Sequence, residues 1–557
     1  MSTLDRDVES FEARARSRPR PEPLRPAKLA LWLALLAFLA FVPTLGNDFV
    51  AWDDPDNFLD NIGFRGLGWR NVRWAWTTMI IGVYQPVAWM ILEVEYLFTG
   101  LNPYGYHLAS ALMHALNTVV LFYLTLELLR RCRPDLEETR PSDFLAMSAL
   151  STALFAVHPM RTEVVAWASA QPYLPCAFFS MLSVLAYLKA NPAGGQEVRS
   201  RRLLGCFLLY AAAVLSKAAA IPLPAVFLVL DVYPLGRLGG DRGWLSGPAR
   251  RALAEKVPFF ALCGVFMVAA VVARVYDRNL DPIENTGISG RVALTSYSVM
   301  FYPIKTLWPF DLHAFYMRPR WAKLFGPQFL LAIAGSVAVT ALLIRDRRRR
   351  PGLLAAWAAY LVMLAPVSGM VTTGMQVAAD RYGYLTMMAF VAPLAAGLCD
   401  LLPGFARLRL TAPRRAAVGF GLILALMTLT YHQCRTWRDS EALWSNGIEH
   451  GAGHVADLHN NLGAVWASKG YYDLAIFAFG EALRIKPGLQ AARDNMNKAI
   501  ANRAKQAGEG RSRKRPKPGP VAFDERWMKR LTDVPTIIES SLASASGPSH
   551  SRTWPSP

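Results

Sequence analysis

Two adjacent carboxylates are the residues in this chain best suited to chemistry. Asp53 and Asp54 lie in the sequence Trp52-Asp53-Asp54-Pro55-Asp56, shortly after an apolar segment. Adjacent carboxylates repel one another, so one of them is expected to bind a proton more tightly than a free carboxyl does. Such a group can take a proton from an acceptor hydroxyl as that hydroxyl attacks a sugar. The alternative interpretation is a solvated Asp/Pro turn that caps a helix.

A polar break interrupts a long apolar stretch and reads His158-Pro159-Met160-Arg161-Thr162-Glu163. Charged groups at membrane depth are costly and usually face a cavity. Arg161 is therefore predicted to hold a phosphate, and Glu163 to position either the acceptor or Arg161. His158 belongs to the same predicted substrate-binding set. The alternative is an ordinary hairpin whose charges lie in water.

Further polar residues follow one face of an apolar helix by their spacing: His107, Ser110, His114 and Asn117. They are candidates for the lining of a substrate cavity, and His107 is included in the predicted binding set. Hydrogen bonding between helices is the alternative role.

Two cations, Lys217 and Arg381, complete the candidate site, together with Tyr382 beside Arg381. A departing lipid phosphate needs positive partners, which Lys and Arg supply. Membrane topology and ion pairing are the alternative roles for these charges.

No metal site is predicted. His450, His454 and His459 have no carboxylate or cysteine at ligand spacing. The six cysteines form neither a metal spacing nor a disulfide framework. A divalent metal at the carboxylate pair stays open but is not expected.

The elements that must position these residues are membrane helices. The 557 residues are 53% hydrophobic and only 18% charged, and long apolar blocks recur. About eleven spans are predicted, at residues 29–46, 106–129, two within 144–189, two within 203–235, 257–274, 325–344, 351–367, 383–403 and 416–432. Residues 292–324 are expected to be re-entrant or to lie at the membrane interface.

Charge sets the predicted orientation. The net charge is +19, but the basic residues cluster between apolar blocks and in the two tails, which is typical of membrane topology and excludes a nucleic-acid groove. Residues 1–28 are therefore expected to be a cytoplasmic basic tail, and the apolar segment after them a retained anchor. The loop 47–105 is then outside, in agreement with its acidic balance. An odd number of spans also places the C-terminal domain outside.

The composition changes after residue 432. Residues 433–505 are predicted to be a helical domain, in which seven residues fit tetratricopeptide spacing: Leu462, Gly463, Trp466, Ala475, Phe479, Ala482 and Pro487. One repeat is short for a free-standing solenoid, so we expect it to dock on the membrane domain or on a protein partner. Residues 506–557 are basic and Ser/Pro-rich, and disorder is predicted there.

Together these features resemble the transmembrane-and-tetratricopeptide-repeat proteins and their bacterial relatives. The landmarks appear in order: Asp53-Asp54, Asn102-Pro103 with His107, the Phe155-Ala156-Val157-His158-Pro159 run with Glu163, Ser216-Lys217, Asp231 to Arg237, Arg381-Tyr382, and Thr436-Trp437-Arg438-Asp439 before the repeat. The family is similar to the protein O-mannosyltransferases of the GT-C class.

The resemblance implies an all-α, GT-C-like membrane domain over residues 29–432. It also implies a polyprenyl- or dolichyl-phosphate sugar donor, usually mannose, and inversion at the anomeric carbon. Asp53 or Asp54 would be the base, with a slight preference for Asp54, and Lys217 and Arg381 would contact phosphate. One departure is Ser169-Ala170-Gln171-Pro172-Tyr173, where relatives often carry charges.

The predicted function is therefore a membrane glycosyltransferase that moves a sugar from a polyprenyl phosphate to a hydroxyl of a protein or glycan, with no resident cofactor. High Ala, Arg and Pro usage favours a bacterial inner membrane protein with a periplasmic repeat domain. Membrane lipids and a protein at the repeat domain are the other expected partners. The alternatives are a non-catalytic scaffold that recruits envelope proteins through its repeat and, less favoured, a transporter, for which no inverted repeat is visible.

Overall fold

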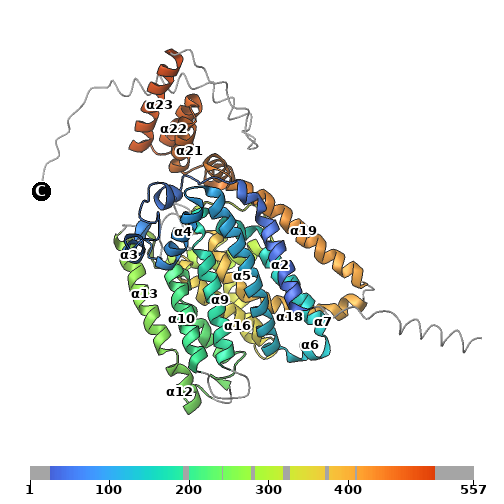
Figure 1. Cartoon of the computed structure of the whole chain (residues 1–557). Coiled ribbons are helices and arrows are strands. Elements are labelled where there is room, and N and C mark those ends of the chain that lie inside the picture. The colour runs from blue at the N-terminus through green and yellow to red at the C-terminus, as the bar shows by residue number, and fades with distance from the viewer. Residues whose placement is uncertain are drawn as a thin grey trace, which may run out of the picture.

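The computed structural model describes residues 25–191, 200–240, 243–276, 283–317, 326–370, 376–407 and 411–508. Almost all of the regular structure is helical, as predicted. A bundle of long helices carries a layer of shorter helices from the first loop at one end, and the C-terminal helices extend from that same end (Figure 1). Most of the predicted tails, residues 1–24 and 509–557, lie outside the described residues.

Seven helices in the described part of the chain are long and apolar enough to cross a membrane: Pro26–Gly46, Pro103–Cys132, Ala168–Ala190, Gly247–Val275, Pro327–Arg345, Asp380–Gly404 and Pro413–Thr436. An eighth is the bent pair Pro141–Ala156 and Pro159–Ala166. The chain is therefore an integral membrane protein. The other predicted spans correspond to shorter helices, at Ser200–Ser216, Ala218–Val232 and Pro351–Val367.

The bundle is built from α2 (Pro26–Phe41), α5 (Pro103–Cys132), α7 (Pro141–Ala156), α9 (Tyr173–Ala190), α10 (Ser200–Ser216), α11 (Leu223–Val232), α13 (Val257–Tyr276), α15 (Pro327–Arg345), α16 (Pro351–Leu364), α18 (Val391–Arg407) and α19 (Ala412–Thr436). Many of these helices begin with proline at the first or second position, where its missing N–H is not needed. Large apolar side chains on α13, α15 and α19 remain exposed, among them Val265, Val337 and Val418. A lipid environment suits such surfaces.

Polar segments interrupt or begin several spans near the end of the bundle that carries the first loop. The polar break predicted at residues 158–163 is a bend. The segment after it, made of the turn η4 (Pro159–Arg161) and α8 (Thr162–Ala166), is bent by 57° relative to α7. A second break separates α10 from α11, with Lys217 and the turn η6 (Ala218–Ala220) between them. A third polar segment, η9 (Asp380–Tyr382), begins the span that continues through α17 (Gly383–Thr386) and η10 (Met387–Phe390) into α18. The breaks place polar residues at helix ends, where they can face one another.

The loop after the first span folds into short helices over the bundle: η2 (Pro55–Leu59), α3 (Trp69–Thr77), η3 (Ile80–Gly82) and α4 (Pro86–Thr99), after the turn η1 (Val42–Gly46). Aromatic packing holds this layer together. Phe58 lies with its ring centroid 5.0 Å from Tyr106 and 5.8 Å from Phe64. Both phenylalanines are fully buried.

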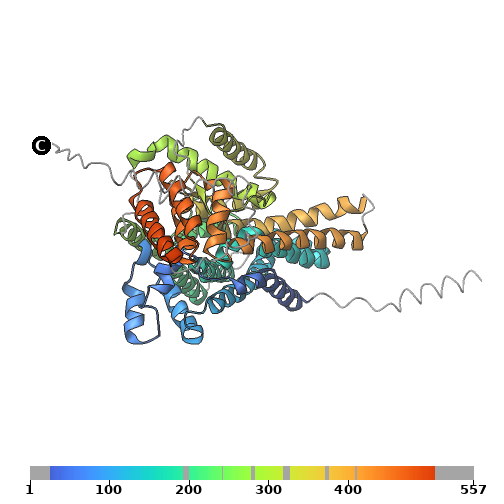
Figure 2. The same cartoon turned by 90° about the horizontal axis from the view of Figure 1, so that it is seen from above.

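The C-terminal helices are α20 (Ser440–Gly447), η11 (Ile448–Ala452), α21 (Ala456–Ser468), α22 (Tyr472–Ile485) and α23 (Gln490–Gly508). They lie over the bundle when seen from above (Figure 2). Gly463 lets α21 and α22 approach closely, since a Cβ there would lie 2.7 Å from Phe479 Cε1. Pro487 follows the end of α22, and α21 packs against α22 as the repeat spacing predicts.

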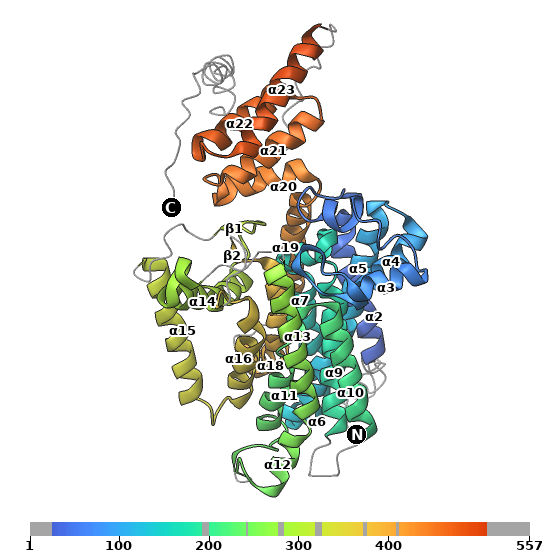
Figure 3. The same ribbon diagram turned by 90° about the vertical axis from the view of Figure 1, so that its left-hand side faces the viewer.

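Two connecting helices, α6 (Pro134–Thr139) and α12 (Gly247–Ala254), lie at the end of the bundle opposite the C-terminal helices (Figures 1 and 3). The stretch predicted to be re-entrant contains the end of α14 (Ile283–Leu307) and the strand β1 (Tyr316–Met317). This strand pairs antiparallel with β2 (Gln376–Ala378) just before η9. Residues 318–325 lie outside the described part.

Candidate active site

Asp54 is a structural anchor of the first loop. It is 1% exposed. Its carboxylate accepts hydrogen bonds from the Val50 N–H at 2.8 Å and from the Ser169 N–H at 3.1 Å, and a short one from the Ser169 hydroxyl. Burial raises the pKa of Asp54 to about 7, against the opposing effect of these hydrogen bonds. The lone pairs of this carboxylate are therefore largely used in holding the loop against residue 169.

Asp53 has different surroundings. Its side chain is partly exposed, and no hydrogen bond fixes its carboxylate among the described residues. Burial raises the pKa of Asp53 above its ordinary value, and the positive charges of Arg381 and Lys217 act in the opposite direction. Asp53 is thus the accessible member of the pair, and it lies close enough to Arg381 and Lys217 for their charges to act on its pKa. The slight sequence preference for Asp54 as the base does not fit this geometry.

Arg381 is held in place by Glu163 and by aromatic rings. Its guanidinium forms an ion pair with Glu163, whose other carboxylate oxygen accepts a 2.8 Å hydrogen bond from the Arg381 N–H. The guanidinium carbon lies 4.9 Å from the ring centroid of Tyr382, 5.6 Å from that of Trp167 and 5.9 Å from that of Trp52. The predicted residues Glu163, Arg381 and Tyr382 therefore come together, with Glu163 positioning Arg381 and not Arg161.

Lys217 lies at the break between α10 and α11. Its ammonium donates a 2.9 Å hydrogen bond to Oε1 of Gln85, which is the residue just before α4. It also lies 5.3 Å from the ring centroid of Tyr173. Lys217 contacts neutral partners here, so its positive charge is not cancelled by a carboxylate at ion-pair distance in the described part of the chain. This leaves a cation directed at the same region as Arg381.

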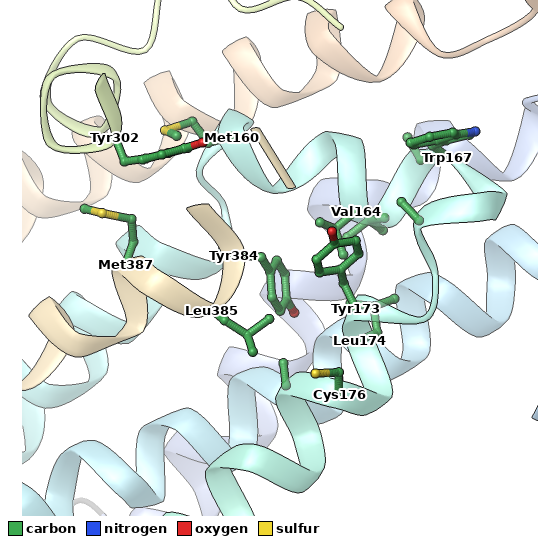
Figure 4. Close-up of a cluster of buried hydrophobic side chains, with 14 of the residues drawn as sticks. Met160, Val164, Trp167, Tyr173, Leu174, Cys176, Tyr302, Tyr384, Leu385 and Met387 are labelled. Atoms are coloured by element: carbon green, nitrogen blue, oxygen red, sulfur yellow. The ribbon is translucent and has the colours of Figure 1, made fainter. Parts of the chain in front are cut away.

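Arg161 does not fit the predicted role of phosphate ligand. It is 1% exposed and donates a 2.7 Å hydrogen bond to the Gly383 carbonyl. Its guanidinium carbon lies 4.4 Å from the Phe155 ring centroid. It also lies 5.9 Å from the ring centroid of Tyr384, which belongs with Met160 and Leu385 to a cluster of buried apolar side chains (Figure 4). Arg161 ties two helix breaks together inside the protein instead.

The two histidines of the predicted set also lie inside the bundle. His158 uses one ring nitrogen to accept from the Met160 N–H at 3.2 Å, and the other lies 3.1 Å from the Thr306 carbonyl. His107 is 1% exposed on α5. On the same face of α5, a ring nitrogen of His114 lies 2.7 Å from the Tyr384 hydroxyl of α17. This contact fits the alternative role of hydrogen bonding between helices. Neither His107 nor His158 is brought to the cations.

Several residues at the site were not predicted as functional. Ser169 receives a 2.9 Å hydrogen bond from Asn57 and passes its own to Asp54. Gln171 donates at 2.8 Å to Glu95, and burial raises the pKa of Glu95 to about 8. Ser169 and Gln171 lie in the segment Ser169–Tyr173, where relatives often carry charges. That departure was the sequence feature that could have marked these two residues as part of the site.

An aromatic stack joins the loop to the C-terminal helices. The Trp52 ring centroid lies 4.8 Å from that of Trp167, 4.6 Å from Phe315 and 6.3 Å from both Trp437 and Trp444. The backbone continues this link, because the Asp48 N–H donates to the Arg438 carbonyl at 2.8 Å and the Ala51 N–H to the Ser440 hydroxyl at 2.7 Å. The residues around Asp53 are thus held by the start of α20.

Comparisons with known proteins agree with the family resemblance. No family model matches the chain. Similar curated proteins are the protein O-mannosyl-transferases Tmtc1 of Drosophila melanogaster (27% identical, over 48% of this chain and 30% of the relative), Tmtc3 of the same species (23%, 75% and 50%) and TMTC4 of Mus musculus (28%, 39% and 31%). The chain is homologous to these proteins at low identity, and it spans half of their length or less.

One solved structure is also similar: the crystal structure of ArnT from Cupriavidus metallidurans bound to undecaprenyl phosphate. The identity is 16% and the TM-score 0.38, over 86% of this chain and 79% of that one.

Proposed function

We propose that this protein is an inverting membrane glycosyltransferase that moves a hexose, mannose or a similar sugar, from a polyprenyl monophosphate to an acceptor hydroxyl. The observation that carries the proposal is the position of Asp53. A partly exposed carboxylate on the first loop lies within electrostatic reach of two cations: Lys217, between α10 and α11, and Arg381, at the start of the span that leads into α18. The homologous proteins named as O-mannosyl-transferases support the same reaction class.

The proposed reaction assigns each group one task. The acceptor hydroxyl gives its proton to the Asp53 carboxylate while its oxygen forms a bond to the anomeric carbon of the sugar. The bond between that carbon and the phosphate oxygen breaks on the opposite face, so the configuration inverts. The electron pair stays on the polyprenyl phosphate, whose charge is balanced by Arg381 and Lys217. Because two cations face a monophosphate, the proposed reaction calls for no resident metal.

The positioning residues act through these groups. Glu163 and the rings of Trp52 and Trp167 hold the Arg381 guanidinium in one orientation. Asp54 and Ser169 fix the loop so that Asp53 is directed at the cations. We place the reaction at the outer surface of a bacterial inner membrane, with the N-terminus cytoplasmic and the C-terminal helices periplasmic. These helices are proposed to be a tetratricopeptide unit that contacts a protein acceptor or partner.

The test is transfer of radiolabelled mannose from polyprenyl-phosphate mannose in membranes that contain the full chain. Asp53→Asn is expected to lower the transfer rate by about 10²–10⁴-fold, the usual contribution of a general base. Asp56→Asn is the matched control, since it removes the same charge from an exposed position three residues away, and it is expected to retain transfer. Equal rates in Asp53→Asn and wild type would reject the catalytic role.

The same membranes separate an enzyme from a scaffold. A scaffold predicts that deletion of residues 433–505 changes the set of envelope proteins recovered, and that Asp53→Asn does not. If the protein is an enzyme, envelope proteins or glycolipids from cells with Asp53→Asn should lack hexose that they carry with wild type, as measured by mass spectrometry. The amount of the variant protein in the membrane should equal that of wild type.

A further inference from the structure

A cavity of about 590 Å³ lies between helices α5, α9, α11, α16 and α18. This volume is within the ~300–1,000 Å³ range of small-molecule sites. Its inner part is lined by apolar side chains, including Leu223, Val226, Met363, Leu385 and Ala392. The cavity is therefore suited to a flexible hydrocarbon group and not to a sugar.

The other end of the cavity is basic. Cys132 and Arg133 line it at the end of α5, and Arg349 and Arg350 line it from the connection between α15 and α16. One carboxylate, Asp400 on α18, also lines the cavity, and it is paired with Arg133. Since α5 has 30 residues and starts at the first outer loop, this end lies about 45 Å along that helix from the loop. The charged end therefore belongs to the opposite surface of the membrane domain from Asp53.

The three arginines at this end differ in how closely carboxylates pair with them. Arg133 forms ion pairs with Asp135 and Asp400 at 3.0 and 3.1 Å. Arg350 is 69% exposed and pairs with Asp346 at 3.5 Å. The Arg349 side chain is exposed and contacts no carboxylate at ion-pair distance in the described part of the chain. Two guanidinium groups at the mouth thus remain accessible to an anion.

We propose that this cavity binds an acyl chain of an anionic phospholipid, with the lipid phosphate held by Arg349 and Arg350. An apolar interior with basic groups at one mouth matches a molecule that has a hydrocarbon chain and an anionic head. Arginine binds phosphate well because its planar group donates two parallel hydrogen bonds. The proposal does not depend on the proposed transfer reaction, since it concerns the other surface of the membrane domain.

The polyprenyl tail of a sugar donor is the competing occupant. Its phosphate would have to lie near Lys217 and Arg381, but neither cation lines the described cavity. The end of the cavity nearer to η9 is formed by apolar residues such as Leu385 and Met388. The accessible cations, Arg349 and Arg350, lie at the opposite end. The charge distribution therefore favours a lipid that enters from the far surface.

The experiment measures lipid binding by native mass spectrometry on the full chain in detergent. Phosphatidylglycerol and phosphatidylcholine with the same acyl chains are the probes. The test variant is Arg349→Gln with Arg350→Gln. The matched control is Arg347→Gln with Arg348→Gln, which removes two charges from the same basic run at positions that do not line the cavity. A third variant, Ala392→Phe, fills the apolar part, and circular dichroism checks its helix content.

We expect phosphatidylglycerol to bind more tightly than phosphatidylcholine. We expect the Arg349/Arg350 variant to lose roughly 30-fold in phosphatidylglycerol affinity, about fivefold per arginine. The control should stay within about twofold of wild type, since its two arginines do not line the cavity. Equal losses in the test and control variants would overturn the proposal, because only general surface charge would then act. Displacement of phosphatidylglycerol by a polyprenyl monophosphate that disappears in Lys217→Gln would overturn it in favour of the donor tail.

Discussion

Asp54→Asn should change the pH dependence of stability in a defined direction. The folded-state pKa of Asp54 is raised to about 7 by burial, and its ordinary value is 3.8. A raised carboxyl pKa means that the folded protein favours the protonated form. The resulting penalty is absent below the ordinary pKa, grows as the pH rises towards 7, and is complete above it.

The size of the effect follows from the two pKa values. The full penalty is about 4 kcal/mol, because each pKa unit is worth about 1.4 kcal/mol. Between pH 6 and pH 8 it grows by roughly 1.4 kcal/mol. Asparagine cannot ionise, so it escapes this penalty. It instead loses a hydrogen bond, since its amide would face the backbone N–H of Val50 or Ser169, at a cost of about 1–3 kcal/mol.

The expected result is therefore a stability gap that depends on pH. At pH 6 the penalty on wild type is already about 3 kcal/mol, so Asp54→Asn should be as stable as wild type or more stable, and its advantage should grow by roughly 1.4 kcal/mol by pH 8. The assay is unfolding of the purified protein in detergent, followed by tryptophan fluorescence at pH 6, 7 and 8. Asp56→Asn is the control for loss of a charge at an exposed position of the same loop. A stability difference that is constant with pH, or that shifts in favour of wild type as the pH rises, would refute the reasoning.

Three further substitutions test other parts of the structure. Glu163→Gln should cost about 3–5 kcal/mol of stability if Arg381 is left as an unpaired buried charge, and the KM for a polyprenyl-phosphate sugar should rise in transfer assays; an unchanged KM would contradict the positioning role. Asp231→Asn should destabilise the far end of the bundle by a similar ~3–5 kcal/mol, because this fully buried carboxylate pairs with two cations; fluorescence-detected unfolding measures it, and less than about 1 kcal/mol would count against that network. Gly463→Ala should destabilise the C-terminal helices by about 1–3 kcal/mol through the close approach of Phe479, and faster proteolysis after residue 436 is the readout, with unchanged cleavage as the contrary result.

The sequence predicted the parts of this fold that depend on local composition. Hydropathy located the apolar segments, and the polar break at residues 158–163 is a real bend because proline and charged residues together do not continue an apolar helix. The acidic pair was also found by its residue type alone. The division of labour within the pair was not, because it depends on Ser169, which is 115 residues away from Asp54 in the chain.

Long-range partners explain the remaining errors. Arg161 was assigned to a phosphate on its charge, but Phe155 and the Gly383 carbonyl satisfy it inside the protein. The pairing of Glu163 with Arg381 spans 218 residues, and no local pattern encodes such a pair. Hydropathy reads one segment at a time and cannot show which helix ends meet.

The attachment of the first loop to the start of α20 makes the C-terminal helices a support of the proposed active site. Asp48 and Ala51 are tied to residues 438 and 440, and Trp52 rests on the rings of Trp437 and Trp444. A chain cut after α19 would lose Trp437, Trp444 and the Arg438 and Ser440 contacts. The position of Asp53 therefore depends on residues that lie some 380 or more positions later in the chain, as the Ala51–Ser440 separation of 389 residues illustrates.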